Sequence, residues 1–274
     1  MAVTALSRVG VLAGWETRAV DTFLFFRDRV PAPEIALVVI DEEAFRELRE
    51  RQPLSRRYLA DLGEFLLRSG ARVVAFDILL TSRSVPEEDA ALVALARHWE
   101  AATAGRVVFA SLAVARKGED GARYAISPPF TPELHGLFGF SNAPVDADGV
   151  IRRLAPVLPA GDGGFVPSFS LSVLAGYRGQ SAEDLAEILR SGAGKGIPLP
   201  GRDSRGSISR EDPISLDILS GTPWRIDFAG SPGAFTPSHQ LGIEEIAGLS
   251  LQNGLVVLSG CETAVGEQVP GAPS

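Results

Sequence analysis

Two aspartates stand where the carboxyl ends of predicted β-strands would place them. Asp41 closes the apolar run EIALVVID, and Asp77 lies near the end of the run ARVVAFDILL. We expect these strands to be adjacent and parallel, so both carboxylates would lie at the edge where open α/β sheets bind ligands, and they could hold a cation or accept hydrogen bonds. The alternative is structural, because buried acids are usually paired: they would cap helices or pair with Arg56 or Arg153.

A second acidic group is the sequence DADG at 146–149. It is similar to the start of a calcium-binding loop, but Val157 stands where such a loop needs its bidentate glutamate. We therefore predict a tight turn between strands, with Gly149 at positive φ. Arg152 and Arg153 follow on a strand, where neighbouring side chains point to opposite faces, so one could reach an internal carboxylate and the other solvent.

These observations predict a polar cluster that either binds a ligand or supports the fold. Its members are Asp41, Arg56, Asp77, Asp148 and Arg153. The three histidines are far apart, and the single cysteine excludes both an internal disulfide and a cysteine-based zinc cage. No phosphate-binding glycine motif lies at a strand–helix junction. We therefore expect no metal and no cofactor.

The single cysteine allows an alternative function. The segment LSGCETAVGE around Cys261 is similar to the signature of caspase-like CHAT proteases, in which the cysteine is the nucleophile. Such a thiolate needs a histidine base nearby. His239 lies in a loop rich in proline and serine, and His135 follows no apolar strand, so neither is in the expected place. A cysteine hydrolase is the enzymatic alternative to a non-catalytic protein.

Charge and hydropathy exclude further classes. The chain has 26 Lys and Arg against 34 Asp and Glu, a net charge of −8, so we expect no nucleic-acid partner, since phosphate contacts need clustered cations. No uncharged run reaches the roughly 20 residues of a transmembrane helix. We expect the chain either to be cytosolic or to be part of a larger protein whose membrane segments lie outside it.

The apolar runs predict the elements that position these residues. Buried strands are expected at 34–41, 71–80, 105–114 and 254–260, and helices at 15–29, 56–70, 86–102, 166–179, 181–192 and 243–249. The middle of the chain, rich in proline and glycine, predicts short additional strands, and 224–230 predicts another. The early β-α-β-α-β order is typical of a parallel sheet. We predict one α/β domain over residues 1–274, a mostly parallel central sheet with helices on both faces in a three-layer sandwich.

Several segments, taken in order, resemble the CHASE type-2 (CHASE2) domain. The resemblance is carried by DTFLFFR (21–27), VVID ending at Asp41, QPLSR (52–56), AFDILL (75–80), GFSN (139–142), DADGVIRR (146–153), PSFSL (167–171), DFAG (227–230) and GLVVLSG (254–260). Both tryptophans of the family's turn before the first long helix are replaced here.

The resemblance implies a non-catalytic sensory domain on the extracytoplasmic side of a bacterial cell membrane. Such domains belong to receptors whose output is a cyclase, a kinase or a similar effector, and membrane helices outside this chain would anchor them. The implied partner is an unknown small molecule or envelope signal. A third possibility is a scaffold that forms a homodimer, for which the aromatic face of helix 15–29 (Phe23, Phe25, Phe26) is suited.

Overall fold

The computed structural model describes most of the chain between residues 53 and 191, with shorter stretches on either side. The described residues are 15, 18–19, 21–22, 35–40, 44–46, 53–102, 106–118, 121–146, 148–161, 163–191, 197–198, 201–202, 208–209, 213–214, 224–225, 240–241 and 255–259. The predicted helix 243–249 lies outside them, as do Asp41 and Cys261. Of the predicted helix 15–29, the described residues, which lie between 15 and 22, are helical.

A six-stranded sheet forms the centre of the fold. Its spatial order is β15 (Gln240–Leu241), β1 (Ile35–Val39), β16 (Leu255–Ser259), β2 (Val73–Asp77), β3 (Arg106–Ser111) and β6 (Phe138–Phe140). Every neighbouring pair runs parallel. The four predicted strands at 34–41, 71–80, 105–114 and 254–260 are therefore confirmed as the middle of a parallel sheet.

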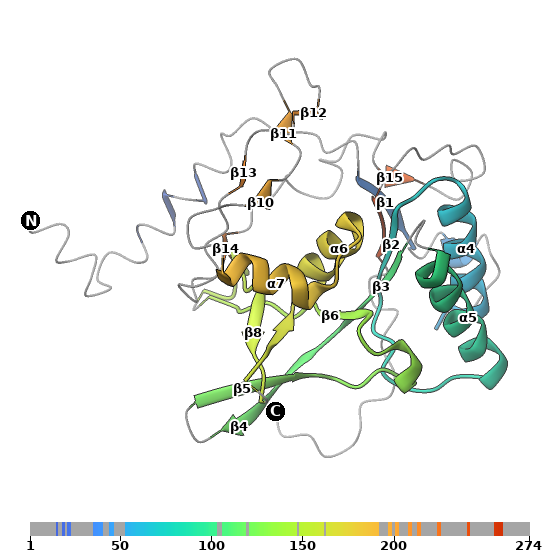
Figure 1. Cartoon of the computed structure of the whole chain (residues 1–274), viewed down its shortest axis with the longest axis horizontal. Helices are drawn as coiled ribbons and strands as arrows, with labels where there is room; N and C mark the ends of the chain where they lie inside the picture. Colours follow the sequence, from blue (N-terminus) through green and yellow to red (C-terminus); the bar gives the residue numbers. More distant parts are fainter. Residues whose placement is uncertain are drawn as a thin grey trace, which may run out of the picture.

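Helices cover both faces of this sheet (Figure 1). Alternate residues of β2 point to opposite faces: Val74 and Phe76 pack in the core shared with α4 (Arg56–Arg68) and α5 (Pro86–Ala102). Val73 and Ala75 pack with Val173 of α6 (Phe169–Arg178) on the other face. All four β2 residues are fully buried. The predicted α/β sandwich of three layers is confirmed.

The strand order corrects one premise of the sequence analysis. The strands that precede Asp41 and contain Asp77 are not adjacent, because β16 lies between them and pairs with both along its whole length. An apolar strand such as LVVLS is stable only when both of its edges are paired and both faces are covered. β1 also differs from the prediction of a fully buried strand: Ile35 is 41% exposed, and β15 pairs with only two of its residues.

The middle and later parts of the chain supply small antiparallel sheets, as predicted for the middle segment. They pair β4 (Ala113–Gly118) with β5 (Gly121–Ile126), β8 (Val157–Pro159) with β9 (Phe165–Pro167), β7 (Arg153–Leu154) with β14 (Trp224–Arg225), β10 (Ile197–Pro198) with β13 (Pro213–Ile214), and β11 (Gly201–Arg202) with β12 (Ile208–Ser209). A 3₁₀ turn, η1 (Pro132–Leu134), precedes β6.

Serine hydroxyls set the beginnings of two helices. Ser55 accepts a hydrogen bond from the Tyr58 amide at the start of α4, and the buried Ser168 accepts one from the Leu171 amide at the start of α6. The helix predicted at 166–179 therefore starts later than expected, because 165–167 form β9. α7 (Ala182–Ser191) follows, within the predicted 181–192.

The segment GFSN fixes β6 against its neighbours. A Cβ atom on Gly139 would lie 2.6 Å from the Ser168 carbonyl oxygen and 2.6 Å from the Phe169 nitrogen, so the backbones of β6 and α6 meet here without room for a side chain. The Asn142 amide oxygen accepts a hydrogen bond from the Ala113 nitrogen at 2.8 Å, and its NH₂ donates to the Ala113 oxygen at 3.1 Å. Close backbone packing thus explains the glycine of this segment, and hydrogen bonding explains its asparagine.

We predict that Gly139→Ala lowers the free energy of unfolding by about 3 kcal/mol or more, at the upper end of overpacking effects, because the clash is with backbone atoms. Urea denaturation provides the measurement. Gly161→Ala is the matched control, since a Cβ there meets nothing within 4 Å, and it should change stability by less than about 0.5 kcal/mol. Equal stabilities of the two variants would contradict the prediction.

Candidate functional site

The DADG segment forms the predicted tight turn. Gly149 has φ of 83°, a conformation that favours glycine. The Gly149 nitrogen donates to the Asp146 oxygen at 2.9 Å, and the Asp146 nitrogen donates to the Val150 oxygen at 2.9 Å. The Asp148 carboxylate accepts from the Val150 nitrogen at 3.2 Å. The turn therefore holds two carboxylates close to both arginines. Of the two, only Arg153 lies in a strand, as the first residue of β7, whereas Arg152 precedes that strand.

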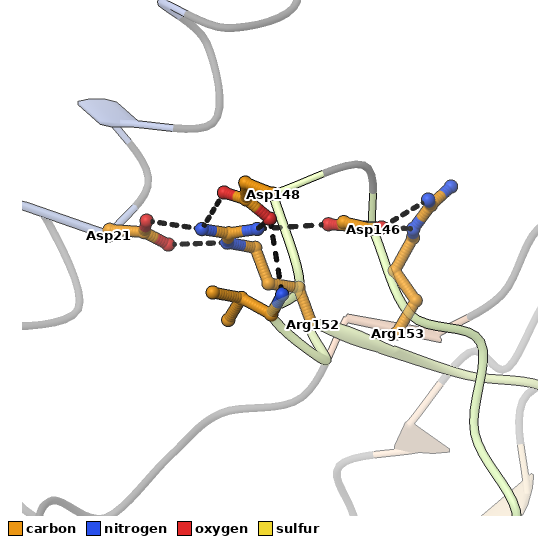
Figure 2. A network of polar contacts seen from close by, with 6 residues as sticks. Asp21, Asp146, Asp148, Arg152 and Arg153 are labelled. Carbon is orange, nitrogen blue, oxygen red and sulfur yellow. Dashed lines mark hydrogen bonds and ion pairs between the residues drawn. The ribbon is translucent and has the colours of Figure 1, made fainter.

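Arg152 occupies the centre of a network of carboxylates (Figure 2). Its Nε and Nη2 donate to the two oxygens of Asp21, both at 2.8 Å. Its Nη1 and Nη2 donate to the two oxygens of Asp148, also at 2.8 Å, and Nη1 donates to Asp146 at 3.2 Å. These bonds match the five N–H groups of a guanidinium, so Arg152 has no donor left for a ligand.

Arg153 extends the network to the surface. It forms an ion pair with Asp146, so this aspartate contacts both arginines. The Arg152 side chain is 11% exposed and the Arg153 side chain 48% exposed. The predicted division between an internal and an outer arginine is therefore found, with Arg152 as the internal one.

The network connects two distant parts of the sequence. Asp21 belongs to the helical N-terminal residues, and it meets Arg152 across 131 positions of the chain. Their two charge-assisted hydrogen bonds form one bidentate contact, which makes the geometry specific. The described residues thus show a joint between the N-terminal helix and the body of the domain.

The charges in the network hold one another ionised. Hydrogen bonds from Arg152 lower the pKa of Asp21, and those from Arg153 lower the pKa of Asp146. Arg152 lowers the pKa of Asp148 to about 2. The carboxylates, Asp21 first, in turn raise the pKa of Arg152. Three carboxylates and two guanidiniums leave one net negative charge, so this network is not suited to an anionic ligand.

A second arginine cluster lies at the carboxyl edge of the sheet. Arg56, the first residue of α4, is 7% exposed and forms an ion pair with Asp89 of α5. Its guanidinium also donates to the Ser82 carbonyl oxygen and lies 4.2 Å from the centre of the Phe130 ring. The Arg56 backbone nitrogen donates to the Glu88 carboxylate at 2.9 Å. This cluster joins the starts of two helices on one face of the sheet.

The five residues predicted to form one polar cluster are therefore distributed. Asp148 and Arg153 belong to the Arg152 network, whereas Arg56 belongs to the cluster at the sheet edge. Asp77 ends β2 and is half-buried, and Asp41 lies outside the described residues. Arg56 pairs with Asp89, which was not among the predicted residues. The pairing proposed between Arg56 and Asp41 lies outside the described residues.

Four charged members of these clusters were not among the five residues predicted to form the polar cluster. Asp146 and Arg152 lie within the recognised segment DADGVIRR, so their signal was present, and Asp21 begins the segment DTFLFFR. Asp89 stands in the first turn of α5, where an acid is favoured by the helix dipole without any partner. That local explanation hid its pairing with Arg56.

The described part of the chain contains neither a candidate metal site nor a candidate membrane-spanning helix. No group of three or more histidine, cysteine or acidic side chains there could hold a metal ion. No helix of this part is both long and apolar enough to cross a bilayer.

The family model of the CHASE2 domain matches residues 1–260. The match extends over nearly the whole chain and includes the segments that form the Arg152 network. No curated protein and no solved structure matches the chain.

We predict that Arg56→Ala lowers the free energy of unfolding by about 3–5 kcal/mol, because it leaves Asp89 as a nearly buried, unpaired charge. Arg57→Ala is the matched control. Arg57 pairs with Asp61 on the exposed side of the same helix, both about two-thirds exposed, and the change should cost less than about 1 kcal/mol. Urea denaturation at neutral pH compares the two variants. Similar losses in the free energy of unfolding would show that the buried Arg56–Asp89 pair contributes no more than the exposed one.

The Arg152 network predicts an acid-dependent loss of stability. The ordinary pKa of Asp148 is 3.8 and its pKa in the fold is about 2, so its contribution is complete above pH 3.8 and is lost as the pH falls towards 2. The stability difference between the wild type and Asp148→Asn should therefore shrink across this range, as measured by urea midpoints. In an Arg152→Met background the difference should already be absent at pH 7. A difference that is constant from pH 7 to pH 2 would refute this assignment.

Proposed function

The chain belongs to the CHASE2 domain family, and from this premise we propose that it is the extracytoplasmic input domain of a membrane-bound bacterial receptor. CHASE2 domains are extracellular sensory domains of signalling proteins, and the family match is the observation that carries the proposal. The domain would detect a small molecule or an envelope condition and would itself catalyse no reaction. Membrane helices that flank it would connect it to a cytoplasmic effector such as a cyclase or kinase.

The Arg152 network supports this proposal by its position. Asp21 lies in the helix that, in such a receptor, would lead from the membrane into the domain, and Arg152 lies in the body. A displacement of either part therefore acts directly on the other. A ligand that binds one arrangement of this joint better than another would shift the balance between two receptor states.

The state of the described polar groups also supports a non-catalytic role. Arg152 has used all its donors, and Arg56 is held by a carboxylate, a carbonyl and an aromatic ring. A catalytic or anion-binding arginine needs at least one donor directed at its substrate. These two clusters are therefore better suited to position elements than to carry out chemistry.

The side of the membrane is the most direct test of the proposal. Trp15 is 72% exposed, so a thiol at this position should be accessible. The test uses the complete gene product with Trp15→Cys and Cys261→Ser, in cells whose outer envelope is permeable but whose cytoplasmic membrane is intact. We expect a membrane-impermeant maleimide to label this protein.

The Cys261→Ser protein without the new thiol is the control for background labelling. Labelling only after the cytoplasmic membrane is broken would place the domain inside the cell and would overturn the proposal. The same variant, labelled equally before and after lysis, supports it.

A further inference from the structure

The hairpin of β4 and β5 extends away from the central sheet (Figure 1). Six residue pairs join its two strands. One face packs on the domain, where Tyr124 and Ile126 contact the small core around Phe140 and Val166. The register places Val114, Arg116 and Arg123 on the opposite face, and Val114 is 50% exposed there.

Arg116 and Arg123 stand directly opposite each other in this hairpin. Side chains in this relation have Cβ atoms about 5 Å apart, and like charges so placed destabilise a strand pair. Within the part of the chain that the structure describes, neither arginine has an ion pair or a side-chain hydrogen bond. Six other described arginines pair with carboxylates, namely Arg56, Arg57, Arg68, Arg97, Arg152 and Arg153. Arg106 instead donates to the Gln180 carbonyl oxygen, and Arg72 lies over the Tyr177 ring.

We propose that Arg116 and Arg123 form a binding site for a tetrahedral oxyanion of the phosphate class. Two guanidinium groups on one face can each present paired N–H donors to such a group, which is the geometry that arginine recognises best. The bound anion would convert the repulsion between the two cations into attraction. This site is separate from the Arg152 network, and its test does not depend on the receptor role proposed above.

What distinguishes this pair in an acidic chain is that the two cations stand opposite each other in one strand pair. With 34 acidic against 26 basic residues, a cation in this protein has an excess of possible internal partners. A local conflict that the fold leaves uncompensated is a feature of functional sites. Glu119 and Asp120, between β4 and β5 in the sequence, are the nearest acids and lie outside the described residues, so the experiment must test them as competitors.

Inorganic phosphate is the first probe. We expect it to bind the full chain saturably by calorimetry and to raise the melting temperature above that in chloride of equal ionic strength. Arg116→Gln and Arg123→Gln should each weaken phosphate binding at least tenfold. Both variants should keep or raise the melting temperature in chloride, because the repulsion is removed. Arg57→Gln, which makes the same change in net charge on α4, should bind phosphate like the wild type.

Three results would overturn the proposal. The first is that neither phosphate nor phosphatidylglycerol vesicles bind saturably. The second is that Arg57→Gln weakens phosphate binding as much as the two hairpin variants do. The third is that phosphate binds only after Glu119→Gln and Asp120→Asn remove the two neighbouring acids.

Vesicles distinguish the source of the anion. Binding to phosphatidylglycerol vesicles but not to phosphatidylcholine vesicles, lost in Arg116→Gln and Arg123→Gln, would assign the site to a lipid headgroup. Saturable binding of phosphate without vesicle binding would assign it to a free oxyanion. Either result supports the site, and both can be obtained even if the domain proves not to be extracytoplasmic.

Discussion

The insertion of β16 between β1 and β2 is the constraint on which the rest of the fold depends. β2 lies in the middle of the sheet with every residue from Val73 to Phe76 fully buried, and it reaches this state only when β16 pairs with one of its edges and β3 with the other. The helices on both faces pack on the surface that this pairing creates. Residues 255–259 thus complete a core whose neighbouring strands β1, β2 and β3 come from residues 35–111.

The polar clusters follow from that arrangement and connect its parts. Arg56 joins the beginnings of α4 and α5 above the carboxyl edge of the sheet. Arg152 joins the N-terminal helical residues to the turn that precedes β7. In both cases a single buried or nearly buried guanidinium satisfies groups from separate elements, which suits its planar fork of donors. The places where separate elements of the fold meet are therefore the places where these two arginines are most fully bonded.

Local signals in the sequence predicted the elements well. β-branched apolar runs indicated the four strands, and Pro86 with three following acids indicated the exact span of α5. The turn at 146–149 followed from its aspartates and Gly149. A proline-flanked serine indicated the start of α6, although the pairing of 165–167 as a strand depends on β8 and is not encoded locally.

Spatial order and long-range partners were beyond those signals. Nothing in the sequence of β1 or β2 shows that a strand nearly 180 residues later separates them, so the adjacency inferred for Asp41 and Asp77 was wrong. Alternation along a strand separates Arg152 from Arg153 but cannot show which faces inward, because that depends on where Asp21 lies. Asp89 has a sufficient local reason to stand in a first helical turn, and its pairing with Arg56 became evident only from the packing of α4 on α5.

The full use of the Arg152 donors has a mechanical consequence. One rigid, planar guanidinium binds both oxygens of Asp21, and Asp148 holds the same guanidinium in place. A sideways movement of the N-terminal helix therefore lengthens both hydrogen bonds to Asp21 together. Such a contact resists small thermal displacements and yields only when two charge-assisted bonds break together. The junction would therefore transmit small displacements of the helix to the body of the domain and would separate only under a large one.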